Sequence, residues 1–391
     1  PDQYRDQWLR LLNYFLDSRA PDLLLISNST LGFASVPYLK ITRPSLPVVT
    51  LRHSADWPAP PCDTDAMADL TIATSRSVVD GLVAKGRPPE RIALHYSGID
   101  LAKWRAYSPQ RAASRQALGI GPETPLILLV SRMSWEKGPD LALRVLERLA
   151  ERGSPFRAVW AGSGPLMDAS RRFLEEKGLN DRVRLLGGVD DPTLHSLFAA
   201  ADVFLLTSRQ EGIPLSILDA FANGLPVVVS AVGGVPELLG AEYEHQVELE
   251  ADEGRTVEAF CRQLQTLLVD AGLRQRLGGQ GLKLVEARFD RRHAGARFEA
   301  LLQQALLAHA LAPVSYDSEP AARFAIAMAA SEALSRSAWI ETKSEVARLR
   351  GLLALTPAAP PDDTEAPTQT VAHHDAPPTA TAAPATTRAK Q

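Results

Sequence analysis

Residues 203–234 read VFLLTSRQEGIPLSILDAFANGLPVVVSAVGG, and this stretch decides the fold class. It begins with the apolar run Val203–Leu206, passes through a polar loop into a helical segment near Pro214, and ends with a second apolar run at Val227–Ser230. Runs that are apolar at consecutive positions are typical of strands covered on both faces. The order strand, helix, strand therefore predicts an α/β fold with a parallel sheet sandwiched by helices.

The same alternation continues on both sides of this stretch. Further strand candidates lie at 126–131, 156–161, 183–186 and 246–249, and a helical segment follows each of them except the last. This series predicts a doubly wound, Rossmann-like domain whose ligand lies at the carboxyl ends of the strands. Helices from Thr256 to about Leu311 complete the globular part.

An earlier series of strand candidates predicts another parallel sheet, with strands at 23–26, 48–51, 70–73 and 91–96. The chain starts inside an amphipathic helix, and a polar stretch at 105–115 separates the two series. We therefore expect a partial N-terminal Rossmann-like domain at 1–110 and a C-terminal one with closing helices at 111–312. An accessory helical segment at 313–355 and a disordered tail rich in Ala, Pro and Thr at 356–391 follow.

Composition limits the class of protein. The chain has 391 residues and is 45% hydrophobic, which allows a sizeable core, and its net charge of -4 speaks against a nucleic-acid partner. Its two cysteines, Cys62 and Cys261, match neither a disulfide scaffold nor a CxxC metal site, which favours a reducing compartment. No apolar run approaches the roughly 18 residues that span a bilayer. We therefore expect a cytoplasmic protein.

Two cations flank the loop after the first strand of the second series. Arg132 offers a planar fork and Lys137 a point charge, and both suit a phosphate pair at a strand end where such folds bind ligands. Lys137 and Gly138 are predicted to open the next helix. The alternative is a pair of ordinary surface cations on a loop.

Two carboxylates frame the helix that follows Leu206. Pro214 suits the first helical position, so Gly212 and Ile213 are predicted to offer unpaired backbone N–H groups to an anion such as a diphosphate. Glu211 and Asp219 are eight positions apart, a rise of about 12 Å if helical, which suits the two ends of a nucleotide sugar. Taken separately, each carboxylate is equally compatible with an ordinary helix charge.

Three weaker signals accompany these. The pair Gly233-Gly234 permits a close backbone approach to a ligand, and Glu237 after it is predicted to cap or charge the next helix. The run Ala161–Pro165 lacks the third glycine of a dinucleotide fingerprint, which argues against a nicotinamide cofactor. His53 follows a strand and is placed to face a cleft, although a structural histidine fits its spacing nearly as well.

From about Asp22 to Leu311 these segments together resemble glycosyltransferase family 4, whose members share the GT-B architecture of two Rossmann-like domains. The most specific parts are Arg132–Gly138 and Ser208–Glu237, which resembles the E-x7-E motif and the glycine pair after it. The resemblance implies that the N-terminal domain serves the acceptor and the C-terminal domain the donor. It also implies donor contacts from a set of residues comprising Arg132, Lys137, Gly212, Ile213, Leu215, Asp219, Gly233 and Gly234.

Catalytic roles are implied in the same way. Glu211 would contact the transferred sugar, Asp219 the ribose, and His53 would be the cleft histidine near the reacting sugar. Family members are retaining enzymes that generally need no divalent metal, so we expect no cofactor and no metal site; cations and a helix end can stabilise a leaving diphosphate instead. The sequence departs from the family pattern at Asp219, where glutamate is usual, and the family's first strands would precede Pro1.

The expected function is transfer of a sugar from a nucleoside-diphosphate sugar to a hydroxyl of a carbohydrate or glycolipid acceptor, in bacterial glycan, polysaccharide or glycolipid biosynthesis. A catalytically inactive nucleotide-sugar-binding or scaffolding module is the alternative, and an epimerase of the same architecture is a further one. The C-terminal extension is a candidate for contact with a protein partner or for peripheral attachment at the inner membrane face.

Overall fold

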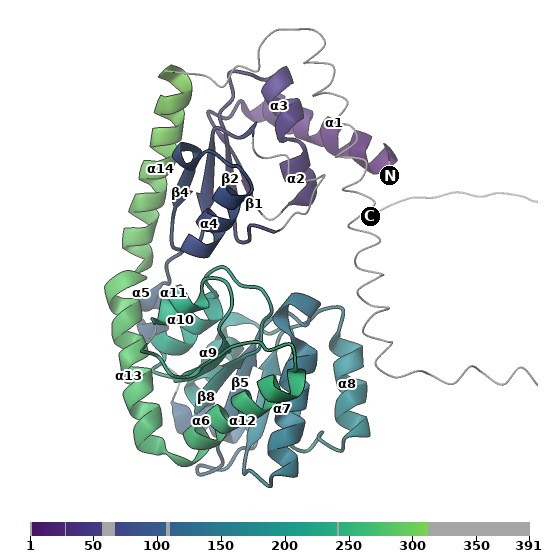
Figure 1. Cartoon of the computed structure of the whole chain (residues 1–391), viewed down its shortest axis with the longest axis vertical. Coiled ribbons are helices and arrows are strands. Elements are labelled where there is room, and N and C mark those ends of the chain that lie inside the picture. Colours follow the sequence, from purple (N-terminus) through teal and green to yellow (C-terminus); the bar gives the residue numbers. More distant parts are fainter. Residues whose placement is uncertain (1, 28, 57–66, 107–109, 241, 312–391) are drawn as a thin grey trace, which may run out of the picture. The chain divides into compact units, whose positions relative to one another are not determined.

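The computed structural model describes residues 2–27, 29–56, 67–106, 110–240 and 242–311. The first sheet is parallel throughout, and its strands run in the order β1-β2-β3-β4. They are β1 (Leu24–Ser27), β2 (Val48–Arg52), β3 (Leu70–Ala73) and β4 (Ile92–Leu94). Each lies within two residues of its predicted position. The sheet is accompanied by α1 (Asp2–Arg19), α2 (Thr30–Ala34), α3 (Val36–Thr42) and α4 (Arg76–Ala84), as Figure 1 shows. The 3-10 turn η2 (Pro89–Arg91) precedes β4.

The second sheet has six parallel strands in the order β10-β9-β8-β5-β6-β7. They are β5 (Leu126–Val130), β6 (Arg157–Ala161), β7 (Val183–Gly187), β8 (Val203–Leu206), β9 (Val227–Ser230) and β10 (Gln246–Val247). The chain winds outward from β5 to β7, returns to β8 beside β5, and winds outward on the other side. This is the doubly wound order, and its topological switch point lies between β5 and β8. The α/β fold class is therefore confirmed.

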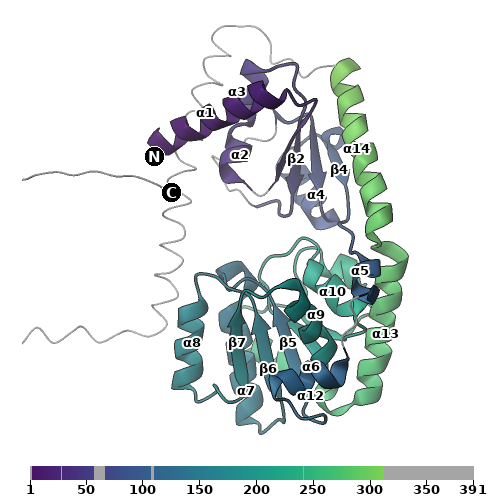
Figure 2. The same ribbon diagram turned by 180° about the vertical axis from the view of Figure 1, so that it is seen from behind.

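Helices surround this second sheet (Figure 2). They are α5 (Leu101–Ala106), α6 (Arg111–Leu118), η3 (Trp135–Lys137), α7 (Pro139–Glu151), α8 (Met167–Glu176), α9 (Asp191–Ala200), α10 (Leu215–Ala222), α11 (Val235–Leu239), α12 (Glu253–Val269) and α13 (Ala271–Arg288). Among the helices of the described part, none has the length and apolarity needed to cross a membrane.

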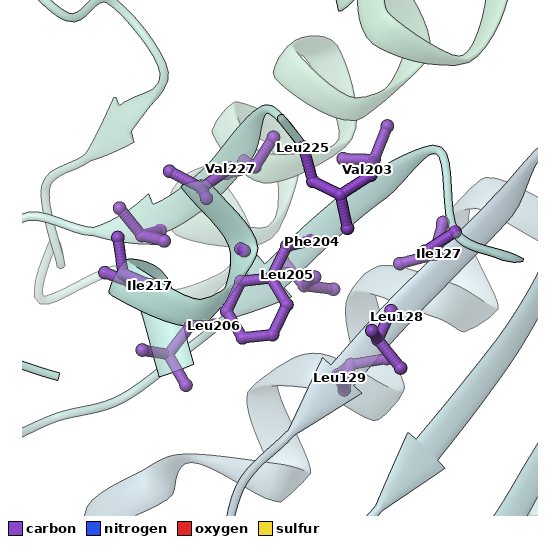
Figure 3. Close-up of a cluster of buried hydrophobic side chains, with 14 of the residues drawn as sticks. Ile127, Leu128, Leu129, Val203, Phe204, Leu205, Leu206, Ile217, Leu225 and Val227 are labelled. Carbon is purple, nitrogen blue, oxygen red and sulfur yellow. The ribbon is translucent and has the colours of Figure 1, made fainter. Parts of the chain in front are cut away.

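The core of the second domain is formed by the consecutive apolar runs. In Figure 3 the side chains of Ile127–Leu129 on β5 and of Val203–Leu206 on β8 gather with Ile217 of α10, and all of these are buried. Complete burial of a Leu, Val or Phe side chain contributes about 1.5–3 kcal/mol, so this cluster holds the switch-point strands firmly in register. The carboxyl ends of β5 and β8 are thus rigid supports for the loops that follow these two strands.

The polar stretch at 105–115 contains more structure than a boundary requires. Its second half enters α6, where the buried Arg115 donates to Asp202, to the carbonyl oxygens of Ala200 and Gly121, and to that of Thr124. An arginine can be buried in this way because each of its donors finds an acceptor. The part of the predicted interruption from Arg111 onward is therefore the start of a helix fixed to the second domain.

The last described helix, α14 (Arg291–Leu311), corrects the expected grouping of the closing helices. Its side chains Phe298 and Ala305 pack in one cluster with Val49 and Ile72 of the first sheet. Its His309 Nδ1 lies 2.8 Å from Asp69 Oδ1. The chain thus returns from the second domain to cover the first sheet, which periodicity could not reveal because it reports an apolar face without identifying what covers it. The predicted segments 313–355 and 356–391 lie outside the described residues.

Candidate active site

A pocket of about 340 Å³ opens at the carboxyl ends of β5 and β8. This is the switch point of the second sheet, where a doubly wound fold binds its ligand. The pocket is lined by residues that come from both sheets, namely His53, Val130, Ser131, Arg132, Lys137, Leu206, Glu211, Gly212, Ile213, Pro214, Leu215 and Ser216. The structure therefore brings together most of the residues singled out from the sequence.

The loop after β5 places the two cations. Lys137 ends the 3-10 turn η3, and α7 begins only at Pro139, so Lys137 precedes the helix that it was predicted to open. Gly138 between them has φ +60°, and a Cβ there would lie 2.1 Å from the carbonyl oxygen of Thr207. Glycine is required because only it combines this backbone conformation with such a close approach. The contact sets the β5 loop directly against the β8 loop.

Lys137 is joined to Glu211 across these two loops. Its Nζ lies 2.7 Å from Glu211 Oε1, which also accepts from the Ser208 hydroxyl at 2.6 Å. The side chain of Glu211 is only 6% exposed, and that of Lys137 is 24% exposed. A carboxylate held by two donors at low exposure is fixed in orientation, which suits contact with the hydroxyls of a sugar.

Arg132 is more loosely held. Its guanidinium donates to Glu136 Oε1, and its side chain is 65% exposed. Burial alone would raise the pKa of Glu136, but hydrogen bonds from Ser134 and the nearby Arg132 hold it below its usual value. Such an exposed ion pair contributes about 0–1 kcal/mol, so an incoming anion can displace it easily.

The N-terminus of α10 opens into the same pocket. Pro214 is the N-cap and Leu215 the first helical residue, one position later than predicted. Leu215 and Ser216 line the pocket, so the first turn of the helix, whose backbone N–H groups have no acceptors within the helix, faces it. Together with the helix dipole this makes a site for a negatively charged group such as phosphate.

His53 reaches the pocket from the end of β2. Burial lowers the pKa of its imidazole, and the positive charge of Lys137 lowers it further. The ring is therefore neutral near pH 7, with one nitrogen as donor and the other as acceptor. A neutral imidazole beside Glu211 and Lys137 can bind a sugar hydroxyl without adding charge to the pocket.

The chain is similar to known proteins. Residues 110–284 match the model of the family described as "Glycosyl transferases group 1". This segment is a group 1 glycosyltransferase domain. The match confirms the resemblance drawn from the Arg132 and Glu211 segments of the sequence.

Individual relatives give the same result. The chain is 27% identical over 253 residues to the sulfoquinovosyl transferase SQD2 of Arabidopsis thaliana, covering 62% of this chain and 47% of that protein. It is 31% identical over 249 residues to the D-inositol 3-phosphate glycosyltransferase of Xylanimonas cellulosilytica, covering 61% and 58%. The aligned regions thus span about half the length of these curated relatives. Its fold resembles that of Anabaena HepE, solved with UDP and glucose, with a TM-score of 0.65 at 20% identity, covering 75% of this chain and 80% of that one.

Asp219 of the glycosyltransferase domain does not line the pocket. It lies in the second turn of α10, where its Oδ1 accepts from the Trp104 indole at 3.0 Å. Burial raises the pKa of this carboxyl to about 7, so near neutral pH it is shared between its charged and neutral forms. Its contact with a ribose stays a prediction.

The glycine pair Gly233-Gly234 lies behind the loop that carries Glu211 and Gly212 rather than on the pocket wall. A Cβ at Gly233, whose φ is +56°, would lie 1.8 Å from the carbonyl oxygen of Glu211. A Cβ at Gly234 would lie 2.3 Å from that of Gly212. These glycines therefore allow one loop to support another, and direct contact with a donor stays a prediction.

The glycines after β6 have a similar explanation. A Cβ at Gly162 would meet the carbonyl oxygen of Ser131, and one at Gly164 that of Met133. They let the two loops pack backbone to backbone beneath the Arg132 segment.

Among the described residues, no cluster of three or more His, Cys, Asp and Glu is placed to hold a metal ion.

Sequence reasoning missed two contributions to the site. Ser208 holds Glu211, which the spacing of three positions permitted but did not single out. Glu237 lies in the first turn of α11 as expected, but its carboxylate caps a helix of the first domain. No local pattern signals that contact, because its partners are 161 and 141 positions away.

Proposed function

We propose that this chain is a retaining glycosyltransferase that moves a sugar from a nucleoside-diphosphate sugar to a hydroxyl acceptor in glycan, polysaccharide or glycolipid biosynthesis. The observation that carries the proposal is the switch-point pocket, in which the Lys137–Glu211 pair, the α10 N-terminus and His53 converge. A module that only supported other proteins would have no physical need for this combination.

The groups present suit each part of such a donor. The diphosphate would lie between Lys137, Arg132 and the first turn of α10, with its charge neutralised by two cations and a helix end. Glu211 would accept hydrogen bonds from the transferred sugar, and His53 would face the same sugar from the other sheet. Asp219 would serve the ribose only after a rearrangement at Trp104.

The reaction follows from this placement. The bond between the anomeric carbon and the diphosphate oxygen breaks, and the acceptor oxygen forms a bond to that carbon on the same face. The proton of the acceptor hydroxyl passes to the leaving diphosphate, so no protein nucleophile is required. Preorganised positive groups stabilise the charge that develops on the leaving oxygen, and we propose that they act without a cofactor or divalent metal.

Relatives support the donor class. HepE was solved with UDP and glucose and also with UDP-glucose, and another structure of similar fold carries ADP. By extension we propose a UDP-, GDP- or ADP-sugar as donor and a carbohydrate or glycolipid as acceptor. A protein or peripheral membrane partner of the segment 313–355 stays an expectation, because that segment lies outside the described residues.

The first test is a thermal-shift titration with UDP, GDP and ADP, with and without EDTA. Ligand bound to the folded state raises stability by about 2.7 kcal/mol at 100 times its Kd. We expect one nucleotide to give a saturable rise in Tm that EDTA does not change and that Arg132→Ala/Lys137→Ala abolishes. The exposed pair Arg184→Ala/Lys283→Ala carries the same change of charge and serves as the control. A folded chain that no nucleotide stabilises would refute the donor site.

Turnover requires its own test. Glu211→Gln keeps the shape of the side chain but removes its charge and replaces one acceptor oxygen by an NH2 donor, so donor turnover should be lost while nucleotide binding persists. Wild-type chain that binds a nucleotide yet neither transfers nor hydrolyses the matching sugar donor would favour the inactive module. Release of an epimerised nucleotide sugar would favour the epimerase.

A further inference from the structure

The side chain of Glu237 connects the two domains. It lies in α11 of the second domain, and its Oε2 accepts from the backbone N–H of Arg76 at 2.6 Å. Its Oε1 accepts from the hydroxyl of Tyr96, which follows β4 of the first domain. Both oxygens of one carboxylate are therefore used by donors from the opposite domain.

The chemistry of this contact favours a firm connection. Arg76 is the first residue of α4, a nine-residue helix, so its N–H has no acceptor within the helix and lies at the positive end of the dipole. Burial and the neighbouring Glu237 raise the pKa of Tyr96 to about 12, so its hydroxyl remains protonated and donates at all physiological pH values. Hydrogen bonds to an ionised acceptor are roughly twice as strong as neutral ones.

Close backbone packing continues from this contact to the pocket. A Cβ at Gly234 would lie 2.8 Å from Ser75 Cβ at the start of α4. A Cβ at Gly212, which lines the pocket, would lie 2.7 Å from Thr74 Oγ1 and 2.9 Å from the carbonyl oxygen of His53. At Gly234 and Gly212 the backbone of the second domain therefore lies directly against atoms of the first domain, with no room for a side chain at either glycine.

His53 belongs to the same rigid group as the residues that Glu237 holds. The N–H of Thr74 donates to the carbonyl oxygen of Arg52 at 3.0 Å, and Arg52 directly precedes His53. A displacement of α4 would carry the ends of β3 and β2 with it, because these strands are hydrogen-bonded neighbours. His53 would then shift relative to Glu211.

We propose that Glu237 is a positioning residue that clamps the first domain against the loop that carries Glu211 and Gly212, and so fixes His53 opposite Glu211 and Lys137. The proposal rests on the proposed function of the pocket. Glu237 touches no substrate in this role; it acts through α4 and the strand ends beside it.

The test compares Glu237→Ala with Glu237→Gln, Tyr96→Phe and the exposed control Glu244→Ala. Three quantities are measured: Kd for the nucleotide that stabilises the wild type, the rate at which the matching sugar donor is hydrolysed to free sugar and nucleotide, and amide hydrogen exchange at Arg76. Hydrolysis needs no identified acceptor. Exchange reports the clamp independently of activity.

For Glu237→Ala we expect hydrolysis to slow by on the order of 10- to 100-fold, because displacing a reacting group by about 1 Å costs up to 100-fold. The Kd for the nucleotide should change less than about two-fold, since the protein groups proposed to bind the diphosphate all lie in the second domain. Amide hydrogen exchange at Arg76 should accelerate. Glu237→Gln keeps an acceptor oxygen and should recover part of the rate. Tyr96→Phe should fall between them, and Glu244→Ala should match the wild type.

The proposal is overturned if Glu237→Ala hydrolyses the donor at the wild-type rate, if it loses nucleotide affinity in proportion to rate, or if exchange at Arg76 is unchanged. A wild-type chain that binds no nucleotide would instead refute the proposed function. Exchange at Arg76 would still decide whether the clamp exists.

Discussion

Replacing Gly233 by alanine should damage the donor site without contacting it. Gly233 has φ +56°, and a Cβ there would lie 1.8 Å from the carbonyl oxygen of Glu211, far inside any real Cβ contact. Opening this distance to 3.0 Å moves the two backbones apart by 3.0 − 1.8 = 1.2 Å. The loop that carries Glu211 must absorb the movement, because Gly233 is followed at once by the packed start of α11.

The expected effect of Gly233→Ala has two parts, a loss of stability and a loss of activity. An L-residue in left-handed backbone costs about 1–2 kcal/mol, which lowers Tm by roughly 2–8 °C in a domain of this size. Gly224 has φ +66° with nothing within 4 Å of an added Cβ, so Gly224→Ala should show this strain alone. Gly233→Ala should show it together with a loss of donor hydrolysis on the order of 100-fold, as expected for a displacement of about 1 Å.

Thermal denaturation and donor hydrolysis measured on both variants separate the two parts. Gly224→Ala controls for backbone strain, so any difference in rate between the variants reports the displaced Glu211 loop. Equal hydrolysis rates in the two variants would refute the reasoning. A Gly233→Ala protein as stable and active as the wild type would show that the loop accommodates a side chain freely.

Three further predictions follow from the charges. Lys137→Met should raise the pKa of His53, observed by NMR titration, because the cation that disfavours the imidazolium is removed. Asp69→Asn should lower the free energy of unfolding by about 3–5 kcal/mol in urea, because it leaves the buried Lys40 unpaired. In the folded state the pKa of Asp219 is raised from 3.8 to about 7. The protein should therefore be most stable with respect to this group below about pH 4, and its free energy of unfolding should decline as the pH rises to 7. Asp219→Asn should remove that decline when unfolding is measured as a function of pH.

Local signals were enough to predict the strands and the loops between them. Consecutive apolar runs such as Val203–Leu206 identify buried strands because both faces of a parallel sheet are covered. The site loops followed from position, since strands of one parallel sheet end at a common edge. Arg132, Lys137 and Glu211 were found in this way, and the structure places all three around one pocket.

The contacts that fix these side chains lay beyond local reasoning. Lys137 and Glu211 are 74 positions apart, and sequence spacing cannot show that the two side chains pair with each other. The return of α14 to the first sheet is hidden for a similar reason. Asp219 was assigned to the donor by its spacing from Glu211 and by resemblance, whereas its neighbour Trp104, 115 positions away, determines where its carboxylate lies.

The two cations of the pocket differ in a way that separates their roles. Arg132 is 65% exposed in its pair with Glu136, so a diphosphate can recruit it at little cost. Lys137 forms an ion pair with Glu211, whose side chain is 6% exposed and also accepts a hydrogen bond from Ser208. Separating this ion pair would leave a desolvated carboxylate without one of its two hydrogen-bond partners. A nucleotide sugar must therefore bind to Lys137 while Lys137 keeps its contact with Glu211. In the proposed reaction, the charge that attracts the diphosphate would then also fix the carboxylate that faces the sugar, so that binding and orientation would depend on one ion pair.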